Sequence, residues 1–113
     1  MQTHDPVIVV SGDKFPFVAN RTKGSIILPG CESVITGANT VFNVDTKTSF
    51  PIAVYFIFWT MVNRISDKDV EWFGFESRDE VLAFFQREHP ELTTNSLVTV
   101  IRFWNDTVFG SGA

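Results

Sequence analysis

The longest apolar stretch of the chain, residues 50–62, is hydrophobic at nearly every position. If it is a strand, both of its faces are apolar, because side chains alternate between the two sides of a strand. Pro51 and five aromatic residues favour a strand over a buried helix, which hydrophobic periodicity leaves open as the alternative. One face would carry Ile52, Val54, Phe56, Phe58, Thr60 and Val62, and the other Ala53, Tyr55, Ile57, Trp59 and Met61.

Both faces of such a strand need a cover. The core of the domain can supply one cover, and a helix, a second sheet or a partner chain must supply the other. This two-sided strand is therefore the first place where we expect a contact surface.

Shorter runs rich in β-branched and aromatic residues predict further strands between turn signals. Pro16 limits its segment to an edge or irregular strand, because proline cannot donate to the hydrogen-bond ladder. Gly37-Ala38-Asn39 predicts a hairpin loop, since glycine and asparagine tolerate a positive φ. The predicted strands besides 50–62 are Val7–Val10, Phe15–Ala19, Ser25–Leu28, Glu32–Thr36, Thr40–Val44, Asp69–Phe75 and Leu97–Trp104.

One helix is predicted over about 77–89. Ser77-Arg78-Asp79-Glu80 is a capping box, in which the Ser77 hydroxyl accepts a hydrogen bond from the backbone N–H of Glu80. Pro90 ends the helix, since proline cannot continue it. The buried stripe is expected to consist of Val81, Leu82, Phe84 and Phe85.

This order of elements is typical of the α+β class. We expect a small single domain over 1–113 with a predominantly antiparallel or mixed β-sheet. The one α-helix, about 77–89, packs on that sheet. Residues 1–6 and 110–113 are expected to be flexible.

Composition adds an aromatic-rich interior and a mild acidity to this picture. The 113 residues include 12 Phe, 3 Trp and 1 Tyr, and the net charge is −4, with nine acids and five bases in 61–113. Nucleic-acid binding needs a basic surface, so we expect no nucleic-acid partner. The longest apolar run, 13 residues, is shorter than the roughly 20 that a membrane-spanning helix needs. Without a signal-peptide pattern either, we expect a cytoplasmic protein with no membrane partner.

Few residues suggest chemistry. A nucleophilic mechanism would have to use Cys31 with His89, and neither has a supporting motif around it. Asp67, Asp69 and Glu71 would share one side of an extended segment, but Lys68 stands among them and no calcium-loop spacing is present. We therefore predict no catalytic residue, no metal site and no cofactor.

We expect a non-enzymatic protein-interaction module that binds a protein partner or forms a homo-oligomer. Aromatic side chains are enriched in binding hot spots, so the predicted contact residues are Tyr55, Ile57, Trp59, Trp72 and Trp104. Small chains without motifs include virus-encoded accessory and inhibitor proteins, and a viral protein that binds a host protein is the expected class. The alternatives are a small-ligand-binding domain with an aromatic-lined pocket, a small virion structural protein, or an enzyme that uses Cys31, His89 or the acidic cluster.

Overall fold

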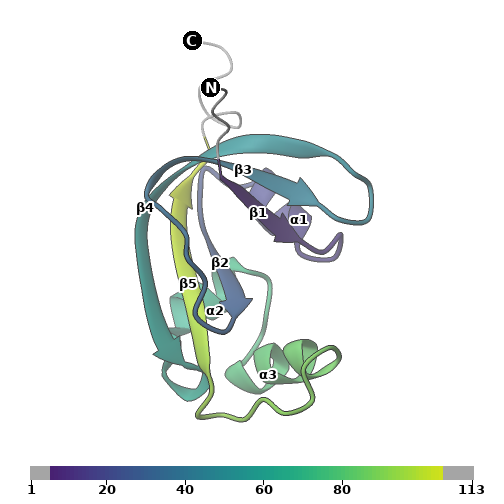
Figure 1. Cartoon of the computed structure of the whole chain (residues 1–113), viewed down its shortest axis with the longest axis vertical. Helices are drawn as coiled ribbons and strands as arrows, with labels where there is room; N and C mark the ends of the chain where they lie inside the picture. The colour runs from purple at the N-terminus through teal and green to yellow at the C-terminus, as the bar shows by residue number, and fades with distance from the viewer. Residues whose placement is uncertain (1–5, 106–113) are drawn as a thin grey trace.

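Between residues 6 and 105 the fold consists of one mixed β-sheet and three α-helices, which is the α+β class as predicted (Figure 1). The structure, a computed structural model, describes residues 6–105. The strand order is β1-β3-β4-β5-β2, with β1 and β3 parallel and the other neighbours antiparallel. The elements in chain order are β1 (Val7–Val10), α1 (Phe15–Ala19), β2 (Lys23–Pro29), β3 (Gly37–Asn43), β4 (Ser49–Met61), the 3-10 helix η1 (Val62–Arg64), α2 (Asp67–Trp72), α3 (Arg78–Gln86) and β5 (Leu97–Trp104).

The long strand β4 connects two halves of the sheet. Ser49–Val54 pair with β3 and Ala53–Met61 pair with β5, and a β-bulge at Tyr55 interrupts the pairing with β5. In Figure 1, β4 crosses the top of the view, bends and then runs down beside β5. Bulges bend a strand and increase its local twist. The prediction of a strand over 50–62, rather than a helix, is confirmed.

The bulge also changes which side chains share a face. Val54 pairs with Phe103, whereas Phe56 pairs with Arg102, so the alternation shifts by one residue at Tyr55. Ile57 and Trp59 consequently lie on the same side of the sheet as Val54. The prediction that Tyr55 shares a face with Ile57 and Trp59 is therefore wrong, because a strict alternation does not allow for an inserted residue.

We call the face of Val54, Ile101 and Phe103 the inner face, and the face of Phe56 and Arg102 the outer face. The inner face packs against α1, whose Val18 is fully buried. The Asn105 side-chain amide fastens α1 by donating to the Val18 and Ala19 carbonyls. The centre of this core is formed by Ile8, Val41, Ile52, Val54, Ile26, Ile101 and Phe103.

Two segments predicted to be extended are helical. Phe15–Ala19 forms α1, with Pro16 in its first turn. The first N–H groups of a helix have no partner within the helix, so a proline there costs no hydrogen bond. Residues 67–72 form α2 instead of a strand, because Ser66 caps this helix by accepting the Asp69 N–H at 3.1 Å.

The predicted hairpin over Gly37-Ala38-Asn39 is also wrong. These residues belong to β3, and residues 32–36 form no strand. The buried Asn39 amide donates to the carbonyls of Ile35 and Gly37, so the side chain serves the turn that precedes β3. The glycine and asparagine therefore mark the start of β3, which pairs with β1 and β4, and not a hairpin loop.

The helix predicted at 77–89 is confirmed as α3, which ends at Gln86. Ser77 Oγ accepts the Glu80 N–H at 3.1 Å, as the capping box requires. Val81 and Phe85 are buried, and Leu82 and Phe84 are half-buried beside them.

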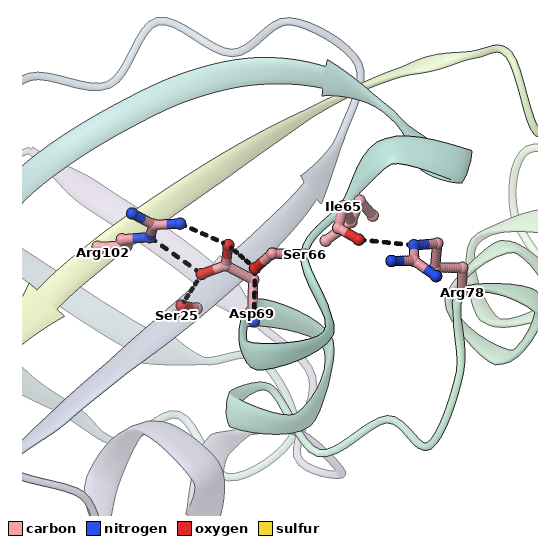
Figure 2. A network of polar contacts seen from close by, with 6 residues as sticks. All are labelled: Ser25, Ile65, Ser66, Asp69, Arg78 and Arg102. Carbon is pink, nitrogen blue, oxygen red and sulfur yellow. Dashed lines mark hydrogen bonds and ion pairs between the residues drawn. The ribbon is translucent and has the colours of Figure 1, made fainter.

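A buried carboxylate joins α2 to the outer face of the sheet (Figure 2). The Asp69 side chain is fully buried and forms two hydrogen bonds with the Arg102 guanidinium, at 3.1 and 2.8 Å. Ser25 and Ser66 donate their hydroxyls to the same carboxylate. Burial raises the pKa of Asp69, but the hydrogen bonds from Arg102, Ser25 and Ser66 outweigh burial and hold this pKa below its ordinary value of 3.8.

Lys14 and Gly74 connect α1 to the turn between α2 and α3. The buried Lys14 ammonium donates to the Gly74 carbonyl at 3.0 Å and lies 3.6 Å from the centre of the Phe75 ring. Burial lowers the pKa of Lys14 below its ordinary value of 10.5, and the charges of Glu80 and Asp13 oppose that shift. Gly74 has a φ of +78°, and a Cβ there would overlap the Phe17 ring.

We expect Arg102→Met to cost about 3 kcal/mol of unfolding free energy, because it leaves the Asp69 carboxylate buried without its cation. The control is Asp67→Asn. It removes the ion pair between Arg78 and the Asp67 carboxylate, which is almost fully exposed. This control should cost less than about 1 kcal/mol. Urea unfolding measures both, and equal costs would contradict the role given to Asp69.

The same carboxylate predicts a pH dependence. Since the pKa of Asp69 is lower in the folded than in the unfolded chain, the unfolded chain binds more protons in acid. The ionised Asp69 stabilises the fold above about pH 3.8. This contribution is lost as the pH falls through the pKa of Asp69 in the folded chain. Asp69→Asn should therefore lose less stability than the wild type between neutral pH and about pH 3. Urea midpoints measured over that range check this, and parallel curves would contradict it.

Gly74→Ala and Gly30→Ala form a matched pair. Both glycines have a φ of +78°, but a Cβ at Gly30 meets nothing within 4 Å. We expect Gly30→Ala to cost about 1–2 kcal/mol for backbone strain. Gly74→Ala should cost about 1–3 kcal/mol more, because Phe17 must move. Equal losses in urea unfolding would show that Phe17 adjusts freely.

Candidate functional site

Four aromatic side chains gather on the outer face around the bulge in β4. We call Tyr55, Phe56, Phe58 and Trp104, together with the cations Lys23 and Arg102, the aromatic surface. Tyr55, Phe56 and Trp104 are 41%, 47% and 40% exposed. Large aromatic side chains are seldom left so exposed next to one another unless they bind something.

The rings and cations of the aromatic surface form two groups of contacts, one around Trp104 and one around Arg102. The Tyr55 and Trp104 ring centres are 5.8 Å apart, and Lys23 Nζ lies 4.5 Å from the Trp104 ring. The Phe56 and Phe58 ring centres are 5.5 Å apart. The Arg102 guanidinium carbon lies 5.5 Å from the Phe56 ring and 5.1 Å from the Phe58 ring. These separations are within the range of aromatic and cation–π contacts.

Strand register brings these residues together from three distant segments. Trp104 stands opposite Ala53 on one side and Lys23 on the other. The bulge places the Tyr55 ring beside Trp104. Without the inserted residue, Tyr55 and Phe56 would point to opposite faces.

The electrostatics of the two cations differ. Asp69 holds the Arg102 side chain in place and balances its charge from beneath the surface. Lys23 forms no ion pair within 6–105 and lies against the exposed Trp104 ring. The aromatic surface therefore offers apolar area next to one uncompensated positive charge.

The predicted contact residues are distributed over three places. Tyr55 and Trp104 meet on the aromatic surface. Ile57 and Trp59 lie on the other side of the sheet, where Trp59 is 58% exposed and its Nε1 donates to the Glu32 carbonyl at 3.4 Å. Trp72 is half-buried on α2, with Lys68 Nζ 4.4 Å from its ring.

Sequence reasoning missed Lys23, Phe56, Phe58 and Arg102 as members of the aromatic surface. The two phenylalanines were assigned to the opposite face from Tyr55, because alternation was extended through the bulge. Arg102 next to Trp104 was a usable local signal. Nothing in the sequence indicates that Lys23 pairs with a residue about eighty positions further on.

The residues considered for catalysis or metal binding are Cys31, His89, Asp67 and Asp69. Cys31 is exposed, and His89 Nδ1 lies 3.9 Å from Glu91. Asp67 and Asp69 are on a helix and contact Arg78 and Arg102, respectively, instead of sharing one side of a strand. No group of three or more His, Cys, Asp or Glu within 6–105 is arranged to hold a metal ion.

A cleft on another part of the molecule lies between the edge strands β1 and β2. Its deeper part, about 380 Å³, is lined by Val9, Val10, Ile27, Leu28, Phe73, Phe84 and Phe85, among others. Three phenylalanines thus line this cleft, together with the charged Asp13, Lys14, Arg87 and Glu88.

None of the helices described between residues 6 and 105 has the length and apolar character that crossing a membrane requires. No family model matches the chain, and no curated protein or solved structure is detectably similar to it.

Proposed function

We propose that this chain is a non-enzymatic protein-interaction module whose aromatic surface binds a partner protein. The observation that carries the proposal is the exposure of Tyr55, Phe56 and Trp104 on one face of the sheet, where the Tyr55 and Trp104 rings are in contact. Tyrosine and tryptophan contribute most to binding where they can be fully desolvated. The Lys23 ammonium at the edge of this area favours a partner that places a carboxylate next to an apolar side chain.

A protein partner fits this surface better than a nucleic acid. Aromatic platforms that stack nucleic-acid bases are accompanied by several cations that follow the phosphate backbone. Among residues 6–105, Asp69 already balances Arg102 on this surface, which leaves Lys23, and the whole chain has a net charge of −4.

A different protein also fits better than a second copy of this chain. A two-fold interface places the same patch on both subunits, which would bring two copies of the Lys23 region together. Like charges that face each other in an interface oppose binding. A partner with complementary charge avoids this cost.

The test begins with capture of partners by the tagged chain from cells in which its gene is naturally expressed. A purified candidate is then titrated against Trp104→Thr and Lys23→Glu variants. We expect Trp104→Thr to weaken binding by about 2 kcal/mol, or roughly 30-fold, as for a hot-spot residue. Lys23→Glu should also weaken binding, and more so at low salt.

Trp59→Thr is the matched control, since Trp59 is the more exposed tryptophan but lies on the other side of the sheet. It should bind like the wild type, and urea unfolding must show that each variant is folded. The proposal fails if all three variants bind equally well. It also fails if light scattering shows a homo-oligomer that Trp104→Thr dissociates, or if the aromatic surface binds a single-stranded oligonucleotide instead.

A further inference from the structure

The second exposed apolar feature is the edge strand β1, which is distant from the aromatic surface in the strand order. Val7 and Val9 are 59% and 52% exposed. Natural proteins commonly protect an edge strand with charged side chains, bulges or a covering loop. β1 has the sequence VIVV, without a charge, and it pairs with β3 without a bulge.

Within residues 6–105, one side of the β1 backbone pairs with no other strand. The carbonyls of Pro6 and Val10 accept hydrogen bonds from Thr40 and Val44, at 2.7 and 3.0 Å. Because backbone groups alternate along a strand, the N–H and C=O of Val7 and Val9 point away from β3. In the described residues, no hydrogen bond to a turn, loop or side chain involves either residue.

This free side faces a continuous groove. The 380 Å³ cleft and a neighbouring depression of about 460 Å³ share Val9, Leu28, Pro29 and His89 in their linings. Leu28 and Pro29 form the opposite wall, where proline has no N–H to offer to a ladder. Phe84 and Phe85 of α3 line the deeper end. One wall thus presents a strand edge and the other presents Leu28 and Pro29, while Asp13, Lys14, Arg87 and Glu88 also line the 380 Å³ cleft.

The outer part of the groove is acidic. Glu32 and Glu91 line the 460 Å³ depression together with His89, and no Lys or Arg is among its lining residues. The charge of this part therefore complements a cation.

We propose that the groove binds an extended, basic peptide segment of a partner protein, which adds to β1 as a further strand. Its backbone would pair with Val7 and Val9, its apolar side chains would pack on Leu28 and Pro29, and a lysine or arginine would lie beside Glu32 and Glu91. Strand addition to an exposed sheet edge is a general mode of peptide recognition. A small apolar ligand would fill the deeper end but would leave the backbone groups of β1 unpaired.

The test uses two short acetylated and amidated peptides, one alternating valine with lysine and one alternating valine with glutamate. Amide NMR spectra should show shifts and slower hydrogen exchange at Val7 and Val9 on addition of the lysine peptide. The glutamate peptide should bind about tenfold more weakly or not at all. Glu91→Lys should reduce this preference for the lysine peptide.

Val9→Pro removes a backbone donor that points away from β3, and edge strands tolerate proline at such a position. Val9→Pro should weaken binding of the lysine peptide by about tenfold, whereas Val9→Thr should leave this binding unchanged. If Val9→Pro does not fold, the lysine peptide methylated on alternate backbone nitrogens makes the same test on the wild-type chain.

The proposal is overturned if both peptides bind equally, if backbone methylation has no effect, or if the shifts map to Tyr55 and Trp104. Shifts at Val7 and Val9 that depend on protein concentration without peptide would assign the edge to a second copy of the chain. Binding of a small apolar dye at the Phe84 end, with no binding of the lysine peptide, would assign the groove to small ligands. Each of these two results also overturns the proposal.

Discussion

The ion pair between Asp69 and Arg102 is the interaction on which most of this structure depends. It connects α2 to β5, and the Ser25 hydroxyl extends the connection to β2. A carboxylate with no access to water is stable only if its hydrogen bonds and its counter-charge are supplied in a fixed geometry. The position of α2 on the sheet is therefore coupled to the orientation of a single guanidinium.

That orientation also matters for the aromatic surface. Arg102 lies between the buried Asp69 and the rings of Phe56 and Phe58, so one side chain belongs both to the interior and to the candidate contact area. The core thus fixes a part of the surface that a partner would meet. Loops could not position these rings as firmly.

The elements that the sequence predicts well are those whose signals are local and strong. The capping box at Ser77 and the apolar run over 50–62 are examples, because each defines its element without help from distant residues. Phe15–Ala19 and Asp69–Phe75 were assigned incorrectly, although Ser66-Asp67-Lys68-Asp69 carries a helix-start signal. The alternation of acids and aromatic residues in that segment resembles a strand, and tertiary contacts of Asp69 and Val70 favour the helix.

The candidate site was only partly predictable for a different reason. Tyr55 and Trp104 could be singled out as aromatic residues in strands, but their neighbourhood depends on an inserted residue that alternation does not reveal. The contribution of Lys23 depends on the pairing of β2 with β5, which joins opposite ends of the described chain. Pairing over such a distance leaves no local trace in a single sequence.

The strand order also has a consequence for how the protein folds. β5 occupies the position between β4 and β2, so the two halves of the sheet cannot be joined until the last strand is present. Closing so long a loop costs entropy before its contacts repay it, and chains dominated by distant contacts fold slowly. During synthesis, β2 has no strand to pair with until residues 97–104 have left the ribosome. Its apolar side chains on both faces of the sheet lack their neighbours until then. Ile26 and Ile27 thus lack their β5 partners, Ile101 and Val100, until β5 has been made.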